Sequence, residues 1–140
     1  MRRYVLTLVA GALLAGCSGS GDTGGWHANE PDGSTTALTI VVTPDAEAAS
    51  TTYTLTCDPA GGDHPQPEQA CGLLANLEAG VLDPVPADRA CTEVYGGPQT
   101  ATVTGTYDGE DVSATFDRTN GCEIDRWEQL GTTFFAVPLQ

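Results

Sequence analysis

Four cysteines carry the most specific chemistry in the chain. Cys57, Cys71, Cys91 and Cys122 contain no Cys-x-x-Cys spacing, and the two histidines lie far apart in the sequence. A zinc site needs clustered cysteine and histidine ligands, so we expect no metal centre. Four cysteines can instead form two disulfides in an oxidising compartment, and their spacing leaves three pairings open.

Side chains suited to catalysis form no recognisable motif. His64 stands in a turn-rich stretch, and no Gly-x-Ser-x-Gly sequence is present. The acidic pair Glu110 and Asp111 follows a predicted hairpin turn, where solvated charges are expected rather than a calcium loop or an acid–base pair. Residues 19–24 match Gly-x-Gly-x-x-Gly but lack the flanking strand and helix of a dinucleotide site. We therefore expect no enzyme activity and no cofactor.

The charge balance excludes several classes of partner. The 140 residues include 19 acids and 5 basic residues, all of them arginine, for a formal net charge of -14. Nucleic acids and anionic lipid surfaces are bound through basic patches, so neither is an expected partner. The chain is long enough for one small core, and its 17 glycines and 9 prolines favour turns and short strands.

The N-terminus has the features of an export signal. Arg2 and Arg3 precede an apolar run at residues 5–15, which is shorter than the ~20 residues that span a bilayer. The run leads into Leu-Ala-Gly before Cys17, which resembles a bacterial lipobox. We expect residues 1–16 to be a lipoprotein signal peptide. A lipid on Cys17 would anchor the exported protein to the outer face of the bacterial cell membrane, and without it the protein would be secreted.

The rest of the sequence divides into a linker and one domain. Residues 17–36 begin at the lipidated cysteine and are rich in glycine, serine and aspartate, as in a flexible tether. Residues 37–140 form the expected domain. Alternating or apolar patterns there predict about five strands, at residues 38–42, 53–57, 103–107, 112–116 and 133–137.

Two short helices are expected beside these strands. Pro67 can open the first, which Gly80 closes, and Asn120 can cap the second, which Gly131 ends. Trp127 has helical spacing with its apolar neighbours and is expected in the core. The pattern predicts an α+β single domain with a mostly antiparallel sheet.

A long segment between the two helices has neither helical nor strand periodicity. Residues 80–98 contain prolines that oppose both structures, at Pro84, Pro86 and Pro98. Long irregular loops in small domains are usually functional or disordered, and a disulfide at Cys91 argues against disorder. We expect a long exposed loop that is held rigid near Cys91, with Tyr95 available to a partner.

At these residues the sequence resembles the Streptomyces subtilisin inhibitor family of serine-protease inhibitors. The resemblance covers residues 38–135 and depends on cysteines in matching order and context. It is carried by the segments YTLTCDP at 53–59, HP at 64–65, AC at 70–71, CTEVY at 91–95 and NGCE at 120–123.

The resemblance implies a fold, a pairing and a reactive site. It implies a five-stranded antiparallel sheet with two helices, sequential disulfides Cys57–Cys71 and Cys91–Cys122, and a homodimer. It also implies a substrate-like loop whose scissile bond is Glu93–Val94. The loop residues named by this comparison are Ala90, Cys91, Thr92, Glu93, Val94 and Tyr95.

The chain departs from the family pattern inside this loop. Members usually place an apolar or basic residue before the scissile bond and often a proline before that, whereas this chain has Glu93 and Thr92. Gly96 and Gly97 also add backbone freedom where rigidity would help. The expected partner is an extracellular serine protease, either subtilisin-like or glutamate-selective. The alternative function is a non-inhibitory cell-surface lipoprotein that uses the inhibitor fold as a binding module.

Overall fold

The computed structural model describes residues 35–137. The predicted signal peptide at 1–16, the lipidation site Cys17 and almost all of the predicted linker lie outside this range. Within residues 35–137, no helix is long and apolar enough to cross a membrane.

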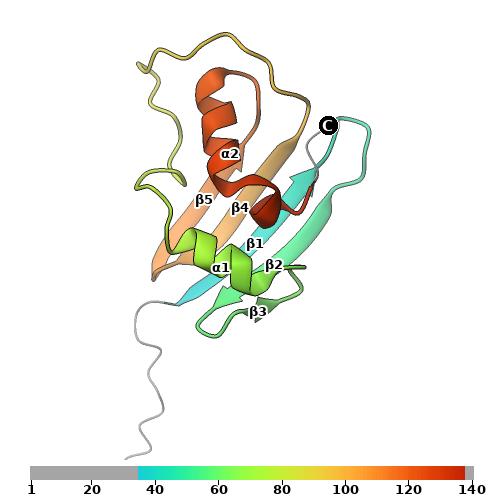
Figure 1. Cartoon of the computed structure of the whole chain (residues 1–140), viewed down its shortest axis with the longest axis vertical. Coiled ribbons are helices and arrows are strands. Elements are labelled where there is room, and N and C mark those ends of the chain that lie inside the picture. The colour runs from blue at the N-terminus through green and yellow to red at the C-terminus, as the bar shows by residue number, and fades with distance from the viewer. Residues whose placement is uncertain (1–34, 138–140) are drawn as a thin grey trace, which may run out of the picture.

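Five antiparallel strands form one sheet, and both helices lie on the same face of it (Figure 1). The strand order is β3-β2-β1-β4-β5, so the first strand in the chain is the central one. The elements are β1 (Thr36–Thr43), β2 (Thr51–Cys57), β3 (Gly61–Gly62), α1 (Pro67–Leu74), β4 (Thr100–Tyr107), β5 (Glu110–Phe116) and α2 (Gly121–Phe135).

The alternation seen in the sequence sets which strand face is buried. Leu38, Ile40 and Val42 of β1 are buried beneath the helices, and Ile40 stands opposite Val103 of β4. On β2 and β4 the alternate positions are mostly threonine, and these side chains face away from the helices. The β4–β5 connection turns at Asp108 and Gly109, both with positive φ, as the predicted hairpin requires.

The second helix supplies most of the aromatic core. Trp127 and Phe135 are fully buried with ring centroids 4.3 Å apart, and Phe135 also meets Phe116 of β5 at 5.3 Å. Trp127 therefore lies in the core, as its spacing predicts. Asn120 caps the helix by accepting a hydrogen bond from the Glu123 N–H at 3.0 Å, which confirms the predicted start.

The predicted strand at residues 133–137 is wrong. Helix α2 continues to Phe135, with a kink at Gly131 where φ is 60° and ψ is -167°. Gly131 interrupts the helix as expected, but the chain then makes another helical turn that buries Phe134 and Phe135. A short apolar run fits a strand and a buried helical turn equally well. The fifth strand is instead β3, a two-residue segment of glycines.

The first helix is shorter than its pattern predicts. It ends at Leu74 rather than near Gly80, and residues 76 and 77 continue in tight turns whose N–H groups bond three residues back. Leu77 still packs against the core from this turn. Gly80, with φ of 87°, serves a later turn.

His64 is a structural residue of this fold. The residue is 4 % exposed, and Nδ1 accepts a hydrogen bond from the Gln66 N–H at 3.1 Å. Nε2 therefore carries the proton and donates to the Phe134 carbonyl at 2.8 Å. Both ring nitrogens are engaged in holding the start of α1 against the end of α2.

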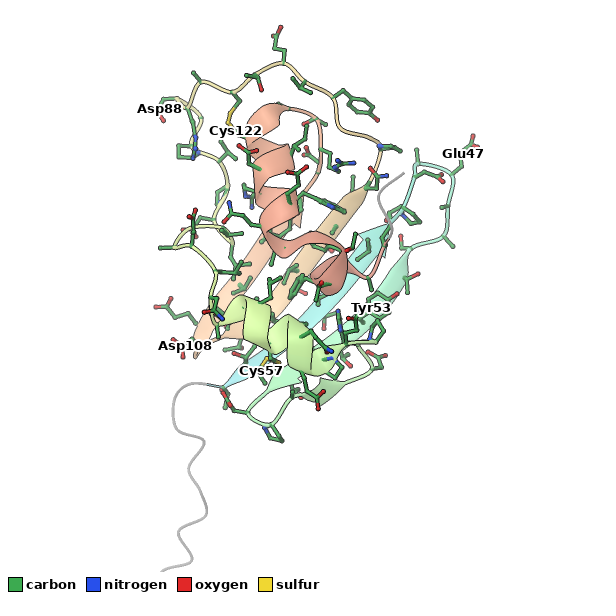
Figure 2. The ribbon with its side chains drawn as sticks, viewed as in Figure 1. Glu47, Tyr53, Cys57, Asp88, Asp108 and Cys122 are labelled. Carbon is green, nitrogen blue, oxygen red and sulfur yellow. A yellow bond between two sulfur atoms is a disulfide. The ribbon has the colours of Figure 1, made fainter. Side chains whose placement is uncertain are left out.

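The disulfides join Cys57 to Cys71 and Cys91 to Cys122, the sequential pairing that the family resemblance implies. The first connects β2 to α1. The second connects the irregular segment to the first turn of α2 (Figure 2).

Candidate functional site

The long loop, residues 75–99, leaves α1, arches around the N-terminal end of α2 and enters β4 (Figure 1). It contains no helix or strand; the sequence predicts this for residues 80–98, whereas for residues 75–79 it predicts a continuation of α1. Near its beginning, Val81 is buried and its carbonyl accepts a hydrogen bond from Arg126 Nε at 3.2 Å. The loop is thus fixed to α2 before it moves out into solvent.

The middle of the long loop is attached to the support segment, residues 117–122, which links β5 to α2. Cys91 is bonded to Cys122, and the Thr92 carbonyl accepts the Gly121 N–H at 2.9 Å. The same carbonyl accepts the Val94 N–H at 2.9 Å, so the chain turns tightly at Glu93.

Gly121 leaves room for the close approach of the Thr92 side chain. A Cβ at this position would lie 2.0 Å from Thr92 Oγ1, well inside van der Waals contact. The glycine in the Asn-Gly-Cys sequence therefore lets the Thr92 side chain rest on the backbone of the support segment.

After residue 95, the loop is attached to the support segment a second time. The Gly96 N–H donates to the Arg118 carbonyl at 2.7 Å, and a Cβ on Gly96 would lie 2.8 Å from Ile124 Cδ1. Gly97 has φ of 133°, and a Cβ there would lie 2.3 Å from Gln99 Oε1. The expectation that these glycines loosen the loop is wrong, because their missing side chains allow the loop to pack closely against its support.

A buried polar pair completes this second attachment. Arg118 and Gln99 are 8 % and 3 % exposed, and Arg118 Nη1 donates to Gln99 Oε1 at 3.3 Å. We call the contacts of Gly96 and Gly97 with Arg118 and Gln99 the downstream anchor. The contacts of Cys91 and Thr92 with Gly121 and Cys122 form the upstream anchor.

Between the two anchors lies the exposed tripeptide, Glu93, Val94 and Tyr95. Val94 is 53 % exposed and Tyr95 is 67 % exposed, and they are the two large hydrophobic side chains found exposed in residues 35–137. Glu93 is exposed as well. Apolar side chains held at the surface of a folded domain favour an interaction site.

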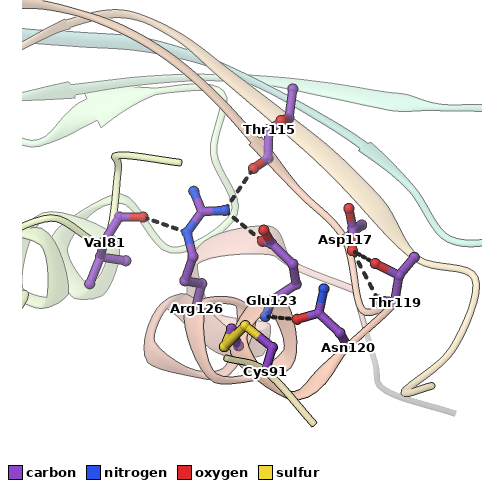
Figure 3. Close-up of polar contacts among 9 residues, drawn as sticks. Val81, Cys91, Thr115, Asp117, Thr119, Asn120, Glu123 and Arg126 are labelled. Carbon is purple, nitrogen blue, oxygen red and sulfur yellow. Dashed lines mark hydrogen bonds and ion pairs between the residues drawn. A yellow bond between two sulfur atoms is a disulfide. The ribbon is translucent and has the colours of Figure 1, made fainter. Parts of the chain in front are cut away.

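The support segment has internal hydrogen bonds of its own (Figure 3). Asp117 accepts hydrogen bonds from the Thr119 N–H at 2.9 Å and the Thr119 hydroxyl at 2.6 Å, and Asn120 caps α2. The turn is therefore held by its own side chains before the loop packs onto it.

Arg126 ties this region to the rest of the molecule (Figure 3). It is buried, and besides Val81 it donates to the Thr115 carbonyl at 3.2 Å and pairs with Glu123 at 2.6 Å. Its guanidinium also lies 4.5 Å from the centre of the Phe116 ring.

Sequence reasoning missed Arg118 and Arg126. Their rarity could have pointed to them, because the sequence has 19 acidic residues but only three arginines after residue 3. Two of those three are buried against the long loop or its support.

The structure brings all six predicted loop residues, Ala90 to Tyr95, onto one projecting segment, with Ala90 and Thr92 to Tyr95 exposed and Cys91 half-buried. Within residues 35–137, no group of three or more histidine, cysteine, aspartate or glutamate side chains is placed to hold a metal ion.

Comparison with known proteins identifies the class. Residues 32–120 match the family described as subtilisin inhibitor-like. The chain is 38% identical over 97 residues to subtilisin inhibitor-like protein 1 of Streptomyces cacaoi, across 64% of this chain and 87% of that protein. It is 34% identical over 143 residues to a subtilase-type protease inhibitor of Streptomyces fradiae, across 96% of this chain and 99% of that protein. The chain therefore belongs to the subtilisin inhibitor-like family, a family of inhibitors rather than enzymes.

A solved structure also aligns with the fold. It is the crystal structure of Streptomyces caespitosus sermetstatin in complex with Bacillus licheniformis subtilisin. The identity is 22% and the TM-score is 0.46, with 74% of this chain and 99% of that chain covered.

Proposed function

We propose that this protein inhibits an extracellular serine protease by presenting Glu93–Val94 as a substrate-like bond. The observation that carries the proposal is the exposed tripeptide, which is fastened on both sides to one support segment. Family membership supports protease inhibition as the activity.

The loop would bind as a substrate does. Residues 90–95 would lie along the protease cleft, where main-chain hydrogen bonds give affinity and successive side chains fill pockets. Glu93 would enter the S1 pocket, with Thr92, Cys91 and Ala90 before it and Val94 and Tyr95 after it. A free peptide loses conformational entropy on binding, whereas the two anchors have already ordered this segment.

Slow release would follow from the same anchors. The serine and histidine of the protease attack the Glu93–Val94 bond, and this chain supplies no catalytic group. After attack, the Glu93 side remains bonded through Cys91 to Cys122, and the Val94 side remains attached at Gly96. Religation then competes with escape of the leaving segment.

Glu93 would decide which protease is inhibited. Burial of an ionised carboxylate in an apolar S1 pocket costs several kcal/mol unless the pocket supplies donors. A glutamate-selective serine protease supplies them, and subtilisin, with an apolar pocket, would be inhibited weakly. Each ~1.4 kcal/mol corresponds to a tenfold difference in affinity.

The place of action would be outside the cytoplasm. The basic start, apolar run and Cys17 motif support export with a lipid anchor, and the two disulfides fit an oxidising compartment. Residues 17–36 would tether the inhibitor to the membrane. A homodimer, as the resemblance implies, is part of this proposal.

A panel of proteases tests the proposal. The purified domain, residues 35–140, would be incubated with subtilisin, trypsin and a glutamyl endopeptidase, and residual activity and cleavage at Glu93–Val94 would be measured. We expect tight inhibition of the glutamyl enzyme with slow cleavage. Rapid digestion of the loop without inhibition of any enzyme would instead support the non-inhibitory binding module.

A further inference from the structure

We infer that Arg118 is a positioning residue that holds the leaving side of the cleaved bond in place for religation. The inference is based on the proposed inhibitory function and concerns the downstream anchor. The disulfide at Cys91 secures only the upstream side, so a different device must hold Val94 once the bond is broken.

The chemistry defines what that device must do. The protease serine oxygen bonds to the Glu93 carbonyl carbon, and the Val94 nitrogen leaves as an amine with a proton from the protease histidine. Religation reverses these steps: the Val94 amine attacks the acyl ester and the serine takes its proton back. If water attacks the ester first, the products are a main-chain α-carboxylate at Glu93 and a free α-amine at Val94. The outcome depends on how long the Val94 amine stays beside the ester.

The structure places the holding contact two residues from that amine. The Gly96 N–H bonds to the Arg118 carbonyl at 2.7 Å, and the backbone of Gly96 lies directly against Ile124 and the Arg118 Cβ. After cleavage, only Val94 and Tyr95 are free to move between the new amine and this contact.

The side chain of Arg118 locks its own carbonyl in position. Its guanidinium lies against Gly97, where a Cβ would be 3.2 Å from Nη1, and donates to the buried Gln99. Gly97, Gln99 and Arg118 are thus packed together, and the side chains of Gln99 and Arg118 are buried. Arg118 Nε has no hydrogen-bond partner within residues 35–137, so the Gln99 contact is the one hydrogen bond seen for this side chain.

The upstream anchor is built independently. It uses the disulfide and the Thr92 carbonyl on Gly121, and neither contact involves the Arg118 side chain. Removal of the Arg118 guanidinium should therefore loosen Val94 while leaving Glu93 in place. Initial binding should change little, whereas the balance between intact and cleaved inhibitor should shift.

The test uses Arg118→Met in the same domain with the glutamyl endopeptidase. We expect the initial inhibition constant to stay within about threefold of the wild type. The ratio of cleaved to intact inhibitor at equilibrium, approached from both forms, should rise about tenfold. Arg118→Lys, which keeps a buried donor, should recover part of this shift. Gln99→Met should reproduce the shift from the other side of the pair.

Arg126→Met is the matched control. It also removes a buried arginine that contacts the loop, but at Val81, ahead of the upstream anchor. The cleaved-to-intact ratio should stay at the wild-type value, even if thermal stability falls. A purely structural role for Arg118 would lower the melting temperature and leave the ratio unchanged.

A second readout does not depend on inhibition. In Arg118→Met, hydrogen exchange should accelerate at the Gly96 amide and stay slow at the Gly121 amide. An unchanged ratio, or equal acceleration at both amides, overturns the inference while wild-type inhibition leaves the proposed function intact. If the wild type inhibits no protease, both proposals fail.

Discussion

The two disulfides fasten regions of opposite character. Cys57–Cys71 joins β2 to α1, where Leu55, Ala70 and Leu74 are already buried in the core. Cys91–Cys122 joins α2 to a loop in which residues 83–98 contribute no buried side chain. The first bond reinforces packing that would hold the two elements together anyway. The second bond holds a loop that has little core packing, because its side chains must stay exposed to contact a partner.

The difference separates stability from function. On the chain-entropy model, the bonds close loops with sequence separations of 14 and 31 and contribute about 3 and about 3.7 kcal/mol. Loop length alone therefore predicts similar contributions of the two bonds to stability. Their structural settings predict that only the second affects protease binding.

Removal of each disulfide in turn has the largest expected effect. Cys91→Ala with Cys122→Ala should weaken inhibition at least about a hundredfold, because the loop must then be ordered on binding. Cys57→Ala with Cys71→Ala should lower the free energy of unfolding by about 3 kcal/mol and leave inhibition within about threefold. The measurements are inhibition constants and denaturant titrations. Equal losses of inhibition in the two double variants would contradict the comparison.

Replacement of Glu93 tests the exposed tripeptide without changing either disulfide. Glu93→Met should strengthen inhibition of subtilisin at least about tenfold and weaken that of a glutamyl endopeptidase, because an apolar side chain suits the S1 pocket of the former. The melting temperature should not change. Asp88→Asn, in the same exposed loop, removes one charge elsewhere and should leave both constants unaltered. An unchanged subtilisin constant for Glu93→Met would refute the role assigned to this side chain.

Crowding the upstream anchor should have a smaller effect. Gly121→Ala places a methyl group 2.0 Å from Thr92 Oγ1, so the Thr92 side chain must leave its place on the support segment, and we expect inhibition to weaken about tenfold. Thr92→Ala removes that oxygen and leaves Cβ at 3.4 Å, an ordinary contact. Adding Gly121→Ala to Thr92→Ala should therefore weaken inhibition no further. A double-mutant cycle of inhibition constants measures this coupling, and additive losses would contradict it.

The smallest effect is expected in the packed region, at Asp63. The backbone N–H of Thr54, and then its hydroxyl, donate to this exposed carboxylate and hold the pKa of Asp63 below its ordinary value of 3.8. A lowered pKa in the folded state adds stability at higher pH, and this is lost as the pH falls through the folded value. Between pH 5 and pH 2, the melting temperature of Asp63→Asn should fall less than that of the wild type, as measured by thermal melts. Inhibition at pH 7 should be the same for both, and a weaker Asp63→Asn inhibitor would link the two regions.

The sheet could be predicted from the sequence because its strands alternate. Leu38, Ile40 and Val42 show a two-residue period with one face buried, and the turn at Asp108 and Gly109 has the residue types that positive φ favours. Strand β3 could not be predicted, because two glycines carry no side-chain pattern. The turn of α2 after Gly131 was missed since its apolar residues are buried on several sides and show no period.

The long loop could be located from its prolines and from Cys91, but its rigidity could not be explained. The resemblance supplied the residues of the proposed reactive bond, whereas the contacts that hold the loop involve residues distant in sequence. Gly96 illustrates the limit: its neighbours Arg118 and Ile124 lie more than 20 positions away. Only the fold shows that this glycine permits close packing rather than freedom.

The exposure of Glu93, Val94 and Tyr95 also affects how such a protein can evolve. Substitutions of such surface residues usually change the free energy of unfolding by less than about 0.5 kcal/mol. Under the proposed function, target choice can therefore change by single substitutions while the sheet, helices and anchors stay the same. Descendants of one such chain can diverge to unrelated proteases without passing through unstable intermediates, and the same property makes the domain a scaffold for displaying chosen tripeptides.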